Sequence, residues 1–239
     1  MSLASHPIAT EMSTRKTARL FGFLFLMTWV TSIAAVALYG PALHDPSAGS
    51  DTQIRLGALF DIGLIITNIG TALVIYPIVK RTTPRLALGW VASRIVESVA
   101  IGIGLISMLA LVATRHHGGA EAGQALIDMK SMTFLLGPGF CVGIGNGLML
   151  GYMMYRSGLV PRRMAQLGMI AGTAVLVSSI AILFGAWEQS GSSPANAVLT
   201  VPEMVWEGFL SIYPLFWGFK TVRAQRAAAI TTPTPALAS

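Results

Sequence analysis

The sequence predicts an all-α integral membrane protein, a bundle of six transmembrane helices with both termini in the cytoplasm. Hydrophobic residues make up 54% of the 239-residue chain, charged residues only 11%, and the mean hydropathy is +0.67. An ordinary soluble domain has about 25% charged residues, and a soluble fold could not hide so much apolar surface. Helices of about 20 residues joined by short connections divide this length into about six spans, so we expect one bundle and no second domain.

The positions of the basic residues are the second observation, because they cluster at the ends of apolar runs. Three Lys or Arg fall in each of four ranges: 15–19, 80–85, 156–163 and 220–226. The connections between these clusters hold only Arg55, Arg115 and Lys130. This bias of twelve to three, which alternates loop by loop, predicts six spans with cytoplasmic ends by the positive-inside rule. The net charge of +6 is therefore a topology signal, and we expect no nucleic-acid partner.

The first span is predicted at residues 20–39, after a polar segment, 1–14, that we expect to be disordered. A cleavage-like triplet, Ala35-Val36-Ala37, leaves open the alternative of a secretory signal peptide. The length of the apolar run favours a retained span, and the whole six-helix domain then covers residues 15–226.

Breakers and basic turns divide the rest of the chain. Prolines and Gly49 predict a loop over residues 40–55, and residues 115–130 read as the longest polar connection. An Ala/Thr/Pro tail over 227–239 is predicted to be disordered. The spans after the first are predicted at 56–79, 86–114, 132–155, 164–187 and 201–219.

The start of the last predicted span carries a capping signature. Thr200 is placed to be the N-cap, with Glu203 at the third helical position, as in a capping box. We therefore expect Glu203 to bond to the backbone at the beginning of the helix.

The fourth predicted span contains a stripe of glycines. In lipid, small residues on one helix face let a neighbouring helix approach closely. Glycine is also common in membrane helices, but the strict register favours packing against a helix of the bundle, a membrane protein partner or a second copy of the chain. The stripe consists of Gly139, Gly143, Gly147 and Gly151.

Two opposite charges, Arg94 and Glu97, lie inside the third predicted span. A charge at the centre of a membrane helix costs about 2.5–3.5 kcal/mol on insertion scales. Their three-residue spacing puts both side chains on one helical face, near the middle of the hydrocarbon layer at a rise of about 1.5 Å per residue. The pair either neutralises itself and locks the bundle or serves a functional site.

Two further acids favour a larger polar centre. Asp61 in the second span and Glu207 in the sixth both fall in the outer half, so we expect them to share one pocket with Arg94 and Glu97. Three carboxylates and one arginine leave two surplus negative charges, which favours the uptake of a proton or cation. Asp61 alternatively lies near enough to the interface to be merely hydrated.

Other polar residues have supporting roles in this interpretation, and none indicates an enzyme. Asn68 and Asn146 are expected to bond between helices. His116-His117 is too small a set for zinc, which needs three or four ligands, so we expect no metal and no cofactor. No catalytic residue is assigned, because a serine nucleophile needs a histidine or lysine base and no span is predicted to hold one.

Four motifs in order connect the chain to a known family. They are Arg19-Leu20-Phe21-Gly22, Arg94-Ile95-Val96-Glu97, Tyr155-Arg156-Ser157-Gly158-Leu159-Val160-Pro161-Arg162 and, after Glu207, Trp217-Gly218-Phe219-Lys220. With them the sequence resembles the bacterial domain-of-unknown-function family 4386 over most of residues 15–223. The resemblance implies a multi-spanning protein of the bacterial cytoplasmic membrane and supplies no reaction.

The leading functional hypothesis is the binding or translocation of a small solute or ion, such as a proton or cation, at the buried acidic-arginine centre. The alternative is a non-catalytic membrane subunit or scaffold that packs through the glycine stripe. A third class, an intramembrane enzyme acting on lipid, lacks a nucleophile.

Overall fold

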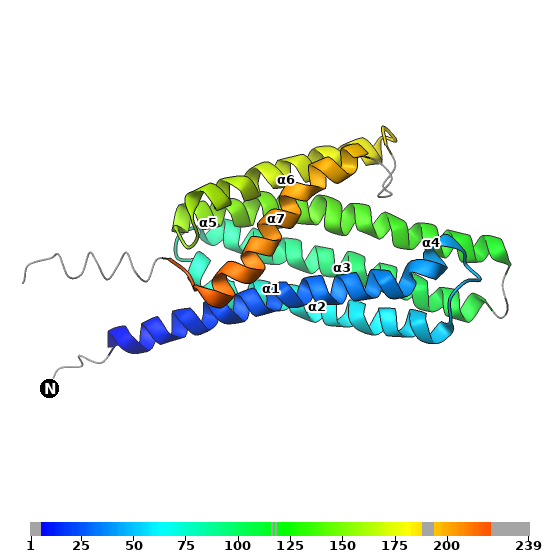
Figure 1. Cartoon of the computed structure of the whole chain (residues 1–239), viewed down its shortest axis with the longest axis horizontal. Helices are drawn as coiled ribbons and strands as arrows, with labels where there is room; N and C mark the ends of the chain where they lie inside the picture. Colours follow the sequence, from blue (N-terminus) through cyan, green and yellow to red (C-terminus); the bar gives the residue numbers. More distant parts are fainter. Residues whose placement is uncertain (1–5, 116, 118, 188–193, 221–239) are drawn as a thin grey trace, which may run out of the picture.

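A computed structural model describes residues 6–115, 117, 119–187 and 194–220, and this part of the chain is all-helical. The described residues form six helical rods that run roughly alongside one another, with α7 crossing obliquely over α1 (Figure 1). The fourth rod is continuous from α4 to α5 and contains two π-helical segments. The elements are α1 (His6–His44), α2 (Asp51–Val79), α3 (Pro84–Thr114), α4 (Ala120–Phe134), η1 (Leu135–Cys141), η2 (Gly143–Leu150), α5 (Gly151–Ser157), α6 (Arg162–Leu183) and α7 (Pro194–Phe216).

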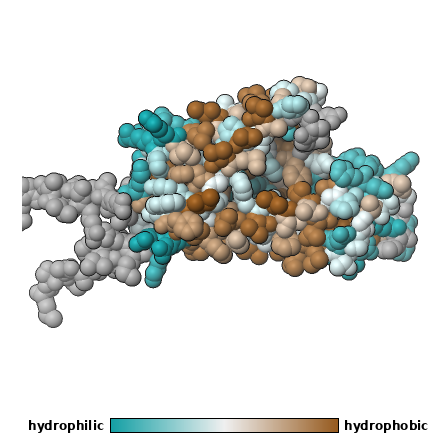
Figure 2. Space-filling view, viewed as in Figure 1, coloured by the Kyte–Doolittle hydropathy of each residue, from teal (hydrophilic) through white to brown (hydrophobic). Residues whose placement is uncertain are grey.

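Five of these rods are long and apolar enough to cross a membrane, which confirms the predicted multi-pass membrane architecture. They are Thr14–His44, Asp51–Val79, Pro84–Thr114, Ala120–Ser157 and Arg162–Leu183. Helix α7 has 23 residues and is not among these five; it carries two glutamates and, after its first residue, two internal prolines. On the face shown in Figure 2, apolar side chains lie between two hydrophilic ends.

The first connection is shorter than predicted. Helix α1 already begins at His6, inside the segment expected to be disordered, and runs through Pro41 to His44. Helix α2 starts at Asp51, where the Ser50 side chain accepts a bond from the Gln53 N–H and Gln53 accepts one from the Ser50 N–H. This capping box fixes the helix start and reduces the predicted 40–55 loop to six residues, 45–50.

The prediction of a polar connection over residues 115–130 was wrong, because helix α4 begins at Ala120. Its composition of Ala, Glu, Gln, Leu and Lys favours a helix. The buried residues Gly123, Ile127 and Lys130 recur every three or four positions and so form one inward face. Lys130 is therefore a buried residue of the bundle, with only 4% of its surface exposed.

The predicted capping box at Thr200 and Glu203 was also wrong. Helix α7 begins at Pro194, and the Thr200 hydroxyl donates to the Asn196 carbonyl oxygen within the helix (2.8 Å). Glu203 thus lies in the helix interior and is buried. Residues 188–193, between the fifth and sixth predicted spans, and the whole predicted tail over 227–239 lie outside the described residues.

The glycine stripe packs against α6 of the same chain. A Cβ atom at Gly147 would collide with the Cα of Gly172, so the two backbones touch. Gly139 and Gly151 face Ser179 and Met169 of the same helix. Because α6 covers this face, the stripe is not available to a second protein, and the scaffold hypothesis loses the surface on which it rested.

Two apolar cores lie toward opposite ends of the bundle and leave a polar layer between them. The core nearer the start of α1 includes Phe21, Phe25, Trp90 and Trp206, and the other includes Ile54 and Met108. The charged residues of the predicted polar centre, Asp61, Arg94, Glu97 and Glu207, lie along the helices between these cores.

Candidate functional site

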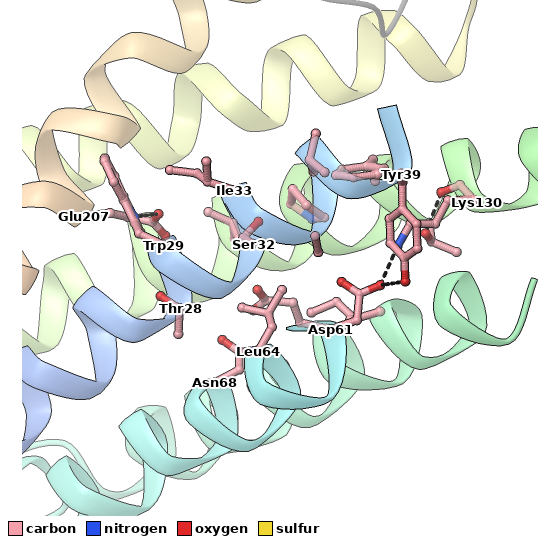
Figure 3. Close-up of a pocket in the computed structure, with 18 of the residues that line it drawn as sticks. Thr28, Trp29, Ser32, Ile33, Tyr39, Asp61, Leu64, Asn68, Lys130 and Glu207 are labelled. Carbon is pink, nitrogen blue, oxygen red and sulfur yellow. Dashed lines mark hydrogen bonds and ion pairs between the residues drawn. The ribbon is translucent and has the colours of Figure 1, made fainter. Parts of the chain in front are cut away.

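A cavity of about 240 Å³ occupies the polar layer, between α1, α2, α3, the fourth rod and α7. Figure 3 shows Glu207 with Trp29 at one end of it and Asp61 with Tyr39 and Lys130 at the other. Five charged side chains line it: Asp61, Arg94, Glu97, Lys130 and Glu207. The four charged residues selected from the sequence thus lie around one cavity, together with a lysine that was not selected.

Arg94 and Glu97 form an ion pair within α3. The Arg94 Nη1 atom lies 2.8 Å from Glu97 Oε2, and the two side chains are 3% and 8% exposed. The guanidinium carbon is 5.1 Å from the centre of the Phe25 ring and 5.7 Å from that of Trp90. These distances allow cation–π attraction to the aromatic core. The pair begins and ends on one helix, three residues apart.

Asp61 and Lys130 form the second ion pair, and this one joins two helices. Lys130 Nζ lies 2.9 Å from Asp61 Oδ2, and each side chain is 5% exposed. The Tyr39 hydroxyl donates to the same oxygen (3.0 Å), and the Lys130 ammonium lies 4.8 Å from the Tyr39 ring centre. The interpretation of Asp61 as a hydrated interfacial residue was therefore wrong.

The expectation that no lysine lies inside the bundle was wrong for the same reason. The three- and four-residue spacing of Gly123, Ile127 and Lys130 is the sequence signal that marks the buried face. Because Asp61 holds its ammonium, Lys130 is not a free base for a serine nucleophile.

Glu207 is held only by uncharged donors. Trp29 Nε1 donates to its Oε2 (3.1 Å) and Asn146 Nδ2 to its Oε1 (2.6 Å). Asn146 in turn accepts a bond from Trp90 Nε1 (3.3 Å), so it connects three helical rods. Within the part of the chain that the structure describes, Glu207 makes no ion pair, unlike the other charged residues of the cavity wall.

Asn68 is bonded on one side only. Its Nδ2 donates to the Ser98 hydroxyl of α3 (3.3 Å), a bond between helices of the expected kind. Its Oδ1 atom is buried, and no partner for it exists among the described residues. The cavity wall therefore contains an unused acceptor at Asn68.

Glu203 is a buried acid whose environment was missed. It is 3% exposed, and neither carboxylate oxygen has a hydrogen-bond partner among the described residues. It precedes Glu207 by four residues and so shares its helix face, but it does not line the cavity. The predicted capping role of Glu203 placed it at the start of a helix, so its burial was not expected.

The structure changes the charge balance of the cavity. Three carboxylates face two cations, Arg94 and Lys130, so the wall has one surplus negative charge in place of the two expected. Glu207 is the carboxylate without a cationic partner. In the described ranges, no group of three or more His, Cys, Asp or Glu is placed to hold a metal ion.

A helical bundle with an apolar belt and a charged cavity midway along its helices defines the class, a multi-pass membrane protein with a buried polar centre. Residues 20–218 match the family described as domain of unknown function (DUF4386), and the chain belongs to this family. This confirms the resemblance seen in the four motifs. Comparisons with curated proteins and with solved structures give no match.

Proposed function

We propose that the protein binds a small solute or ion, such as a proton or cation, in the central cavity and carries it across the bacterial cytoplasmic membrane. The observation that carries the proposal is Glu207, a carboxylate in the cavity wall whose partners, Trp29 and Asn146, are neutral. An ionised carboxylate is costly in a medium of low polarity unless a cation or proton compensates it. A bound positive charge would remove that cost.

The size of the cavity supports a ligand with few atoms. At about 240 Å³ it is slightly smaller than the pockets of roughly 300–1,000 Å³ that hold drug-sized molecules. It also lies midway along the helices, where secondary transporters place their substrates, near the centre of the bilayer. The position and the volume together favour a small polar species over a lipid.

The first experiment follows proton or cation flux into liposomes that contain the purified protein. We expect the flux to disappear in Glu207→Gln, which keeps the shape of the side chain and removes its charge. Glu121→Gln, at an exposed position of α4, is the matched control and should behave as wild type. Flux in Glu207→Gln equal to that of wild type would contradict the proposal.

We also propose that α7 is a sixth span and that both termini lie in the cytoplasm. The start of α1, the α2–α3 and α5–α6 turns and the end of α7 lie at one end of the bundle, and the four basic clusters begin there (Figure 1). Since Lys130 is buried, Arg55 and Arg115 are the basic residues left near the opposite end. The asymmetry is thus stronger than the sequence count indicated.

Cysteine labelling tests this orientation. In a Cys141→Ala background, a membrane-impermeant thiol reagent added to whole cells should label Ser47→Cys in the α1–α2 loop. It should label Thr82→Cys in the α2–α3 turn only after the cells are opened. The reverse pattern would invert the topology.

A further inference from the structure

The Arg94 guanidinium has one unused binding edge. Its Nη1 atom bonds to Glu97, whereas Nε and Nη2 are buried and have no hydrogen-bond partner among the described residues. These two nitrogens form the side edge of the guanidinium, which binds both oxygens of a carboxylate through two parallel bonds. Arg94 is 98% buried, since only 2% of its surface is exposed, and it lines the cavity.

An unused edge of this kind indicates a ligand, because buried polar groups in native proteins are almost always bonded. Arginine cannot lose its proton to avoid the cost, so the partner of these nitrogens comes from outside the described residues, as water or as a ligand. The Phe25 and Trp90 rings stabilise the positive charge but offer no oxygen acceptor. A carboxylate in the cavity would satisfy both nitrogens at once.

The same cavity has an unmatched negative group. Glu207 has neutral partners and no ion pair in the described part of the chain, and it lines the same cavity as Arg94. Asn68 adds an acceptor, Oδ1, that no described residue uses. Arg94, whose side edge is unbonded, and Glu207, which has no ion pair among the described residues, therefore line the same small cavity.

We propose that the ligand of this cavity is a small zwitterion of the amino-acid type, with its carboxylate on Arg94 Nε and Nη2 and its ammonium group at Glu207. This inference rests on the proposed function and specifies its substrate class. A simple cation would leave the Arg94 edge empty, and a simple anion would add to the surplus negative charge. A zwitterion satisfies both groups and leaves the net charge of the site unchanged.

The volume allows such a molecule. A water molecule occupies about 30 Å³ in the liquid, so a cavity of about 240 Å³ has the volume of roughly eight waters. That is enough for a small amino acid with a short side chain. The separation of the two charged groups in the ligand is then the property that the site selects.

The test compares matched probes that differ by one charged group. Alanine, β-alanine and γ-aminobutyrate are zwitterions with increasing charge separation, ethylamine lacks the carboxylate, propionate lacks the amine, and propionamide has no charge. Binding of each probe to the purified protein is measured by equilibrium dialysis. We expect at least one zwitterion to bind ten times or more tightly than ethylamine, propionate and propionamide.

Two variants separate the ends of the ligand. Arg94→Lys keeps a positive charge for Glu97 but removes the fork, so zwitterion affinity should fall at least tenfold while ethylamine affinity stays the same. Arg85→Lys, exposed on the same helix, should bind like wild type. Glu207→Gln should weaken the zwitterion and leave propionate unaffected, which keeps the test decisive if Arg94→Lys does not fold.

The outcomes distinguish the two proposals. If ethylamine or propionate binds as tightly as every zwitterion, the zwitterion assignment is overturned while solute binding in the cavity stands. If no probe binds and Glu207→Gln leaves proton and cation flux unchanged, the proposed function fails as well.

Discussion

The ion pair between Asp61 and Lys130 predicts a large difference between single and double replacements. The pair joins α2 to α4 at 2.9 Å, and both side chains are 5% exposed. Lys130→Met would leave the Asp61 carboxylate buried with the Tyr39 hydroxyl as its remaining side-chain partner among the described residues. Asp61→Leu would leave a buried ammonium beside an apolar side chain. Replacing both removes the charges together.

The magnitude follows from the burial. Removing one partner of a buried ion pair costs about 3–5 kcal/mol, whereas replacing both with apolar residues of similar volume is often neutral or stabilising. For a protein of about 150–250 residues, 1 kcal/mol shifts Tm by about 2–4 °C. Each single variant is therefore expected to melt about 6–20 °C below wild type, and the double variant close to it.

The assay is thermal unfolding of wild type, Lys130→Met, Asp61→Leu and the double variant in one detergent. Asp51→Asn is the control, because Asp51 pairs with Arg115 at the edge of the bundle with 33% of its side chain exposed. Since this pair is only partly buried, its loss should lower Tm by less than the loss of the Asp61–Lys130 pair does. Additive effects in the double variant, or single variants that melt like wild type, would refute a buried pair between the two helices.

Two other predictions concern packing and a loop. Gly147→Leu is expected to abolish the folded protein, because any side chain at this position meets the backbone of Gly172. Gly40→Leu should be tolerated, since nothing lies within 4 Å of a Cβ atom at Gly40. Size-exclusion profiles of the two variants test this difference. The backbone N–H and then the hydroxyl of Ser47 hold the pKa of Asp45 below its ordinary value. The Ser47 hydrogen bonds stabilise the folded state at pH values above the pKa of Asp45 in the unfolded chain. This stabilisation is lost as the pH falls through the lowered pKa that Asp45 has in the folded state. Ser47→Ala should move this pKa part of the way back, as followed by NMR titration.

The membrane architecture was predictable from the sequence because hydropathy and basic flanks are summed over about 20 residues at a time. Single substitutions or errors of a few residues do not change such sums. Helix ends depend on local competition and were less predictable. The Ser50 capping box ends the first loop early, whereas the similar pattern at Thr200 lies inside a helix that began at Pro194.

The charged members of the site were predictable from the cost of placing them in lipid, but their partners were not. Lys130 is 69 residues from Asp61 in the chain, and only the packing of both α2 and α4 on α3 brings them together. A buried Lys130 was not predicted, because the apolar run of the fourth span starts after it. The amphipathic beginning of the fourth rod was therefore predicted to be a loop. The burial of Glu203 was not predicted, because the capping-box pattern assigned this residue to the start of the helix.

The two ion pairs of the cavity have different structural consequences. The Asp61–Lys130 pair connects separate helices, so it contributes directly to their arrangement. The Arg94–Glu97 ion pair begins and ends on α3, so the pair itself does not join two helices, and the contact of Arg94 with α1 is made through the Phe25 ring. Each of its charges nevertheless bears the cost of burial, and an apolar pair at these positions would pack the bundle without it. The ion pair and the Phe25 contact account for the charge of Arg94, whereas its unbonded Nε and Nη2 atoms are accounted for by the ligand proposed for the cavity.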